Sequence, residues 1–174
     1  MIPDARPIRQ RRIRKLSDYQ RVWKGFHVDR NLQDDWLESL NSLKTLRLIS
    51  ICEGHAYNHN RALFRSRPHI NLRLKAAYLP LLPNEFDAIS YDLQDKLIQL
   101  FGSHNTSATC EYRISLNSSS ARQIIRRDLV VRIVAPIIRT SDEIDQEITG
   151  WFEKIIPAIQ QLDDFILLNL KIAE

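Results

Sequence analysis

The sequence is short of the residues that mark several protein classes. Its 174 residues include only two cysteines and four glycines. Two cysteines argue against the disulfide framework of a small secreted domain, and the low glycine content excludes a collagen-like repeat. No run of about 18 apolar residues is present, which excludes a membrane-spanning helix. The basic N-terminus is not followed by the apolar stretch of a secretory signal, so the chain is predicted to be cytoplasmic.

What is present is typical of a soluble globular protein. Hydrophobic residues make up 44% of the chain and charged residues 26%, close to the averages for folded domains. The length favours one domain, and no internal linker or low-complexity tract interrupts the chain. We therefore predict a flexible basic arm over residues 1–15 and a single domain over residues 16–174.

Positive charge is unevenly distributed along the chain. The formal net charge is +4, but residues 1–15 carry six basic side chains against Asp4 alone, so the rest of the chain sums to about −1. Such an arm either neutralises nucleic-acid phosphates or is a solvated terminus. The rest of the chain is also divided in charge, because residues 44–75 are basic and residues 140–174 are acidic. A homodimer in which the acidic last helix docks on a basic face of a second copy is therefore a separate hypothesis.

Hydrophobic periodicity predicts the secondary structure. Three strands alternate between apolar and polar residues, and stripes at helical spacing mark the longer helices. The alternation assigns Ile70, Leu72, Leu129 and Val131, among others, to the core. The segment 53–67 lacks either period and is predicted to be a long loop. The expected helices cover residues 17–27, 31–43 with Asn31 as N-cap, 84–100, and a region beginning at Thr140 or Ser141 that Pro157 should kink or split; the expected strands cover 45–52, 69–76, 107–116 and 123–135.

The fold class follows from this order of elements. Leaving aside the short first helix, it reads α-β-β-α-β-β-α, with strands 107–116 and 123–135 forming a hairpin. The simplest way to bury the apolar stripes is an α+β fold, in which a four-stranded antiparallel sheet has its helices packed on one face. The layout broadly resembles α+β modules of the secretion-chaperone type, which are usually acidic, whereas this chain is basic.

Strand alternation places polar residues together on the other face of the sheet. This face is cationic with two carboxylates, and it suits an anionic small molecule or an acidic protein surface. It carries no aromatic residue, which disfavours the base stacking of RNA-binding sheets. The residues assigned to it are His69, Asn71, Arg73, Lys75, Thr109, Glu111, Arg113, Ser115, Arg126, Asp128 and Arg132.

The stretch from Cys52 to His59 combines side chains suited to chemistry. Cys52, His55, His59 and His69 are zinc-ligand types, although their spacing is not that of a standard finger. Cys52 could instead be a nucleophile with His55 or His69 as its base, although no orienting third group is identifiable. A third interpretation is that Cys52 is a small core residue, since alternation along the strand puts it on the same side as Leu46 and Leu48. Ile49 and Ile51, on the other side, are also apolar, so the sequence does not decide which side faces the core.

The residues from Ser50 to His55 resemble a Ser-x-Cys-x-Gly-His turn found in small uncharacterised bacterial and phage proteins. The resemblance covers six residues at the same strand-to-loop position, and it implies no activity.

These observations favour a binding domain over an enzyme. The favoured hypothesis is recognition of an anionic ligand or partner by the polar sheet face and the 53–67 loop. The alternatives are a Cys/His-centred enzyme or zinc protein and a self-associating structural module; the residues identify no particular cofactor. The predicted ligand-binding residues are His55, Arg61, Arg65, Arg67, His69, Arg73 and Arg113.

Overall fold

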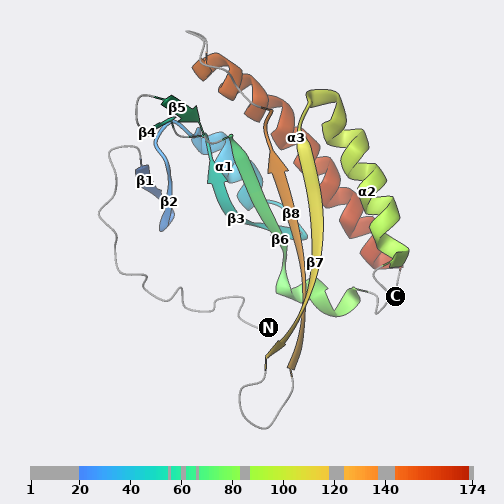
Figure 1. Cartoon of the computed structure of the whole chain (residues 1–174). Helices are drawn as coiled ribbons and strands as arrows, with labels where there is room; N and C mark the ends of the chain where they lie inside the picture. The colour runs from blue at the N-terminus through green and yellow to red at the C-terminus, as the bar shows by residue number, and fades with distance from the viewer. Residues whose placement is uncertain are drawn as a thin grey trace.

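The protein is an α+β fold built on a four-stranded antiparallel sheet (Figure 1). The computed structural model describes residues 20–54, 56–59, 62–65, 67–82, 87–117, 124–136 and 144–172. Only the backbone is described at 56–59, 62–65, 87–90, 113–117, 124–127, 144–145 and 171–172. The elements are β1 (Gln20–Trp23), β2 (Phe26–Asp29), α1 (Asp34–Asn41), β3 (Leu46–Cys52), β4 (Ala56–His59), β5 (Ala62–Arg65), β6 (His69–Leu74), the 3-10 helix η1 (Ala76–Leu81), α2 (Asp87–Phe101), the 3-10 helix η2 (Gly102–His104), β7 (Ser107–Asn117), β8 (Ile124–Val134) and α3 (Ile144–Ile172).

The main sheet has the strand order β3-β6-β8-β7. All three pairings are antiparallel, and β7 and β8 pair over their full length. The predicted hairpin of the third and fourth strands is therefore confirmed. The predicted order of elements was incomplete, because two further hairpins, β1–β2 and β4–β5, interrupt it.

The predicted helix over residues 17–27 is wrong where the structure describes it. Residues 20–29 form the hairpin β1–β2, in which Trp23 lies opposite Phe26. Its two-residue turn is Lys24-Gly25, with φ of 44° and 82°. Positive φ at both central residues is the geometry that matches the twist of paired strands. The glycine that weakened the expected helix thus permits the hairpin turn.

The predicted loop over residues 53–67 contains the hairpin β4–β5. Ala56 lies opposite Arg65, and His59 lies opposite Ala62. Each strand is only four residues long, which is too short for a clear alternation of apolar and polar residues to be recognised in the sequence.

The expected helix over residues 31–43 is α1, which starts later than predicted. Its N-cap is Gln33, with no side-chain cap, so the assignment of Asn31 was wrong. Asn31 Nδ2 instead donates to Glu53 Oε1 at 3.3 Å. Asp34 and Asp35 do occupy the first turn, where the helix dipole favours acidic side chains.

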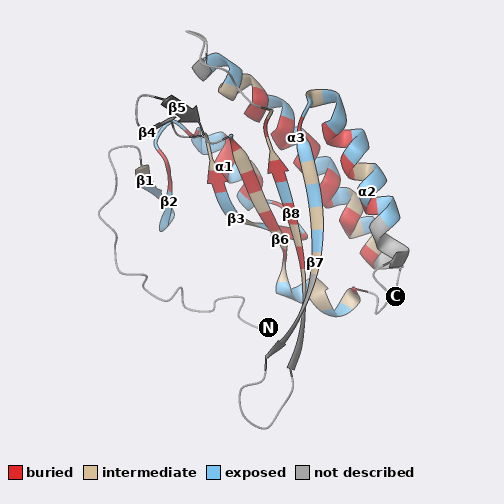
Figure 2. Cartoon of the chain, in the orientation of Figure 1, coloured by how far each residue is buried: buried red, intermediate tan, exposed pale blue. Residues whose placement is uncertain are grey.

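The core lies between the sheet and the helices, as the burial colours show (Figure 2). Ile70, Leu72 and Leu74 of β6 are almost completely buried, and so are Leu129, Val131 and Ile133 of β8. Trp36 of α1 stacks on Phe152 of α3, with ring centroids 4.9 Å apart. Buried side chains of the sheet strands and of the helices belong to one hydrophobic cluster.

The last helix, α3, runs unbroken for 29 residues with Pro157 inside it. Pro157 lacks an N–H, so one intrahelical hydrogen bond is lost, but the helix does not divide as one prediction had it. The part of the chain that the structure describes contains no helix long and apolar enough to cross a membrane.

A buried carboxylate connects α3 to the start of β3. Asp163 is 2% exposed. Its Oδ1 accepts hydrogen bonds from the backbone N–H of Thr45 and of Leu46, at 2.9 and 2.8 Å, and from Thr45 Oγ1 at 2.5 Å. Its Oδ2 accepts from the backbone N–H of Lys44 at 2.5 Å. This contact fixes the edge strand of the main sheet against the helix layer.

Candidate functional site

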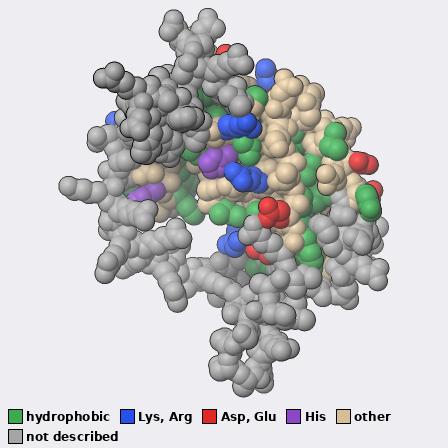
Figure 3. All heavy atoms as spheres, viewed as in Figure 1, with side chains coloured by type: hydrophobic (Ala, Val, Ile, Leu, Met, Phe, Trp, Pro, Cys, Tyr) green, Lys and Arg blue, Asp and Glu red, His purple; other side chains and the backbone are tan. Residues whose placement is uncertain are grey.

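The polar face of the main sheet is the candidate site. We call it the open face and define it by the described residues Arg47, Ser50, Cys52, His69, Asn71, Arg73, Thr109, Glu111, Asp128 and Arg132. Within β6 and β8 these side chains alternate with fully buried ones such as Leu72 and Val131. Figure 3 shows Lys, Arg and His side chains gathered over the middle of this face.

A β-bulge in β3 decides which of its residues reach the open face. The register with β6 shifts between Leu48 and Ser50, which leaves Ile49 unpaired and 44% exposed. Beyond the bulge, Ile51 faces the core, while Ser50 pairs with Asn71 and Cys52 pairs with His69. A bulge inserts one residue and reverses the side-chain parity of the rest of the strand. Cys52 therefore belongs to the open face, and the interpretation of Cys52 as a core residue on the parity of Leu46 does not hold.

Two arginines lie directly opposite each other across β3 and β6. Arg47 pairs in register with Arg73, and like charges in this position destabilise a sheet. Asp128 of β8 offsets the positive charge of Arg73, because Asp128 Oδ2 lies 3.1 Å from Arg73 Nε. The contact is an ion pair and not an aligned hydrogen bond, since Arg73 Nε and Asp128 Oδ1 have no hydrogen-bond partner among the described residues. Arg47 is exposed and lies beside the ion pair of Arg73 with Asp128.

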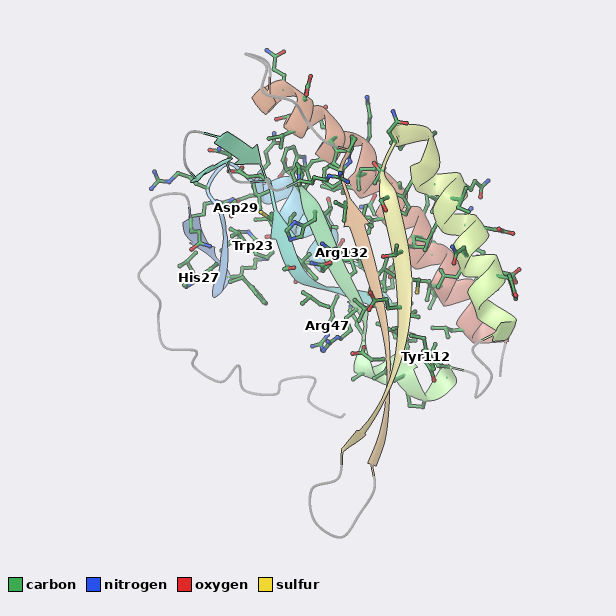
Figure 4. The ribbon with its side chains drawn as sticks, in the orientation of Figure 1. Trp23, His27, Asp29, Arg47, Tyr112 and Arg132 are labelled. Carbon is green, nitrogen blue, oxygen red and sulfur yellow. The ribbon has the colours of Figure 1, made fainter. Side chains whose placement is uncertain are left out.

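A row of polar side chains crosses the sheet next to this pair. In register, Ser50, Asn71, Arg132 and Thr109 follow one another over the four strands. Asn71 Nδ2 donates to Ser50 Oγ at 2.8 Å. Arg132 is exposed and has no ion pair with another described residue, and neither has Arg47. Both arginines are labelled in Figure 4, one from β8 and one from β3.

His69 lies on this surface opposite Cys52. Its Nδ1 lies 3.2 Å from the carbonyl oxygen of Arg67. A carbonyl can only accept, so Nδ1 is the donor in this contact. Lys75, which the alternation also placed on this face, donates instead to the carbonyl of Leu43 at 2.5 Å.

Cys52 lies at one end of the open face, next to β2. Its Sγ accepts a hydrogen bond from the N–H of Gly54 at 3.3 Å. The neighbouring carboxylate of Asp29 is 4% exposed and accepts from the N–H of Glu53 at 2.8 Å. Burial raises the pKa of Cys52 to about 11, and the negative charges of Asp29 and Glu53 act in the same direction. These surroundings keep the sulfur protonated at neutral pH, whereas a nucleophile needs the thiolate.

We expect slow alkylation of Cys52 in the folded protein. Because its pKa is raised from 9.0 to about 11, its thiolate fraction near neutral pH falls about one hundredfold. The rate at which iodoacetamide alkylates Cys52 should rise with pH up to about 11. Unfolding in urea should give Cys52 the faster alkylation of an ordinary thiol at lower pH. Mass spectrometry of the peptides separates Cys52 from Cys110, whose pKa burial raises to about 12 and which should react more slowly still. Rapid labelling of folded Cys52 at neutral pH would contradict this environment.

The structure brings together part of the predicted site. Cys52 and His69 are cross-strand neighbours, and Arg73 lies on the same face. Arg67 is exposed just before β6. His55 and Arg61 lie outside the described residues, as do the side chains of His59, Arg65 and Arg113 and the arm over residues 1–15. Among the described side chains, no group of three or more His, Cys, Asp or Glu residues is placed to hold a metal ion.

Two arginines of the open face were missing from the predicted ligand-binding set. Arg132 was assigned to this face by the alternation of its strand but was not selected as a ligand. Arg47 was not assigned to it at all, because the apolar residues around the bulge hide the alternation of β3. Its position becomes evident only from the register with β6.

No protein-family model matches this chain, and comparison with curated proteins and with solved structures finds no match either.

Proposed function

We propose that this chain is a binding protein whose open face recognises an anionic group on a small molecule or on an acidic protein surface. In this proposal all three helices pack on the opposite face, so that the open face stays accessible. The segment 53–67 borders the site and contributes His55, Arg61 and Arg65. The setting is the cytoplasm. Nucleic-acid binding through the basic arm is a separate and less favoured activity.

One observation carries the proposal. Arg47 and Arg132 are exposed cations without a described ion-pair partner, and Arg47 lies opposite a second arginine. Asp128 neutralises Arg73, whereas Arg47 has no carboxylate beside it among the described residues, so an anion bound over β3 and β6 would supply the missing negative charge. Asn71 and His69 add polar side chains to the same face. None of the described residues that define the open face is aromatic, which favours charge recognition over base stacking.

The test is calorimetric titration of the protein with inorganic pyrophosphate and, separately, with an octaglutamate peptide at low salt. We expect one of them to bind, with an affinity that falls as salt is added. Binding of pyrophosphate alone would indicate a small-molecule site, and binding of the peptide alone would indicate an acidic protein partner. R132E should reduce the affinity about tenfold to one hundredfold, because it removes a charge-assisted hydrogen bond and adds a repulsive charge.

The matched control is K154E, which makes the same change of charge at an exposed position on α3. It should leave the affinity nearly unchanged. Equal losses in R132E and K154E would show that only the total charge matters and would contradict a site on the open face. Absence of binding to both probes at low salt would also contradict it.

A second candidate function is a Cys/His centre. It rests on the cross-strand pairing of Cys52 with His69 beside the buried carboxylate of Asp29. The raised pKa of Cys52 opposes a nucleophilic role but not a metal-bound thiolate, because a metal ion displaces the proton. Stoichiometric zinc in untagged protein, lost on substitution of Cys52, would favour this candidate over an anion site.

A further inference from the structure

The two edge strands of the main sheet differ in length and in regularity. The β3 edge is only seven residues long and contains the bulge at Ile49. Next to it, the N–H of Glu53 is bound by Asp29 of β2. The β7 edge is 11 residues long and follows β8 in continuous register without a bulge. No strand of the described chain pairs with its outer side.

The β7 edge also lacks most of the features by which proteins protect such strands. Exposed edges are normally shortened, bulged, or protected by proline or by charged side chains, lysine above all. The two charges of β7, Glu111 and Arg113, are opposite in sign. From Ser107 to Asn117 the strand contains no proline, glycine or lysine. Unpaired N–H and C=O groups along an edge of this length are a template for another strand. The strand is therefore suited to pairing with a second chain.

An apolar flank of α2 lies at the same edge of the molecule. α2 packs beside β7, on the side of the molecule away from β3 (Figure 1). On this helix Tyr91 is 77% exposed and Ile98 is 63% exposed, and a separation of seven residues places them on one flank. Lys96 lies over the ring of Phe165 and so marks the flank that faces α3. Ile98 is two residues further on, about 200° round the helix, and so points away from α3.

We propose that two copies of this chain associate through antiparallel pairing of β7 with β7 about a two-fold axis at Tyr112. The two sheets then become one sheet of eight strands. In this register Glu111 lies opposite Arg113 of the second copy, and Thr109 lies opposite Ser115 of the second copy. The two-fold axis makes each of these pairs occur twice, as an isologous interface requires.

Charge and apolar surface agree in favouring this arrangement. Glu111 and Arg113 have opposite charges and stand two positions apart, so antiparallel self-pairing centred between them joins unlike charges. A register shifted by two residues in either direction would place Glu111 opposite Glu111 of the second copy, or Arg113 opposite Arg113 of the second copy, so that like charges would meet. The same axis turns the α2 flank with Tyr91 and Ile98 toward its counterpart, which removes exposed apolar area from water.

This dimer extends beyond the proposed anion site and does not depend on it. The interface uses β7 and α2, whereas the anion site is centred on β3, β6 and β8. Pairing would place the two open faces side by side on one continuous sheet. R132E should therefore weaken anion binding and keep its association state, which separates failure of one proposal from failure of the other.

The experiment is sedimentation velocity on the full chain from about 1 to about 100 µM, the range that covers weak and moderate dimers. We expect a dimer in the wild type. E111K and R113E, each of which creates two like-charge pairs across the axis, should weaken it at least about tenfold. I98D should also weaken it. The control E147K, an exposed charge reversal on α3, should not.

Mixing the two charge variants tests the register itself. A heterodimer of E111K with R113E sets a lysine and an arginine of one chain opposite two glutamates of the other, so native mass spectrometry should find mixed dimers in preference to either homodimer. Circular dichroism verifies that each variant is folded. A monomeric wild type at the highest concentration would overturn the proposal. So would dimers that survive the single reversals, or a mixture that fails to form heterodimers.

Discussion

Replacing Asp163 by alanine should lower the free energy of unfolding by about 3–5 kcal/mol. The carboxylate accepts hydrogen bonds from three consecutive backbone N–H groups, of Lys44, Thr45 and Leu46, and from the hydroxyl of Thr45. Thr45 and Leu46 are fully buried, so their donors would find no water in exchange. Each buried donor left without a partner costs about 1–3 kcal/mol. Urea unfolding followed by circular dichroism measures the loss.

Asp164 provides a matched control one residue away on the same helix. Its Oδ1 forms an ion pair with Lys44 Nζ at 2.7 Å, but both side chains are more than half exposed. D164A should therefore cost less than about 1 kcal/mol. D163N should fall between the two, because it keeps the Oδ1 acceptor but turns an amide NH2 toward the N–H of Lys44. Similar losses in D163A and D164A would show that charge near Lys44, not the buried hydrogen bonds, holds β3 to α3.

The role of Asp163 illustrates what the sequence alone could not reveal. Residues 140–174 are acidic overall, and helical spacing places Asp163 on the same side of the helix as Ile159 and Ile166, but it does not reveal which groups the carboxylate meets. Only the folded chain shows that one lies against the start of β3 and the other in solvent. Hydrogen bonds between residues this far apart in sequence leave no periodic signal.

Regular elements were predictable where one period dominates. The alternation of β6 and of β8 identified Ile70, Leu72, Leu129 and Val131 as core residues, and all four are buried. The same alternation placed Arg73 and Arg132 together on the opposite face. The four-stranded antiparallel sheet followed from these patterns and from the turn before β8.

The errors arose where a turn or a bulge interrupts the period. Lys24-Gly25 is not one of the sequence pairs that typically mark a hairpin, so the β1–β2 hairpin was not predicted. In β3, the apolar residues on both sides of the bulge hid the change of face at Ile49. This one inserted residue moves Cys52 out of the core and beside His69, and so determines which residues form the candidate site.

Replacing Phe152 by alanine should destabilise the protein by about 3–5 kcal/mol, through loss of buried area and creation of a cavity. Phe152 is fully buried. It stacks on Trp36 of α1 and meets the ring of Trp151 edge-on, at a centroid distance of 4.8 Å. Trp151 in turn donates from Nε1 to Thr106 Oγ1, immediately before β7. Phe152 therefore lies where α1, α3 and the approach to β7 meet.

Tryptophan fluorescence during urea unfolding reports directly on this cluster, because Trp36 and Trp151 are two of the three tryptophans in the chain. F152A should shift the native emission to longer wavelength as water reaches the rings, and should move the unfolding midpoint to lower urea. L168A is the control: Leu168 lies on the same helix but is 62% exposed, so its loss should change stability by less than about 0.5 kcal/mol. F152L, which retains most of the side-chain volume, should restore much of the stability lost in F152A. Equal effects of F152A and L168A would contradict a role for this aromatic cluster in holding the helix layer together.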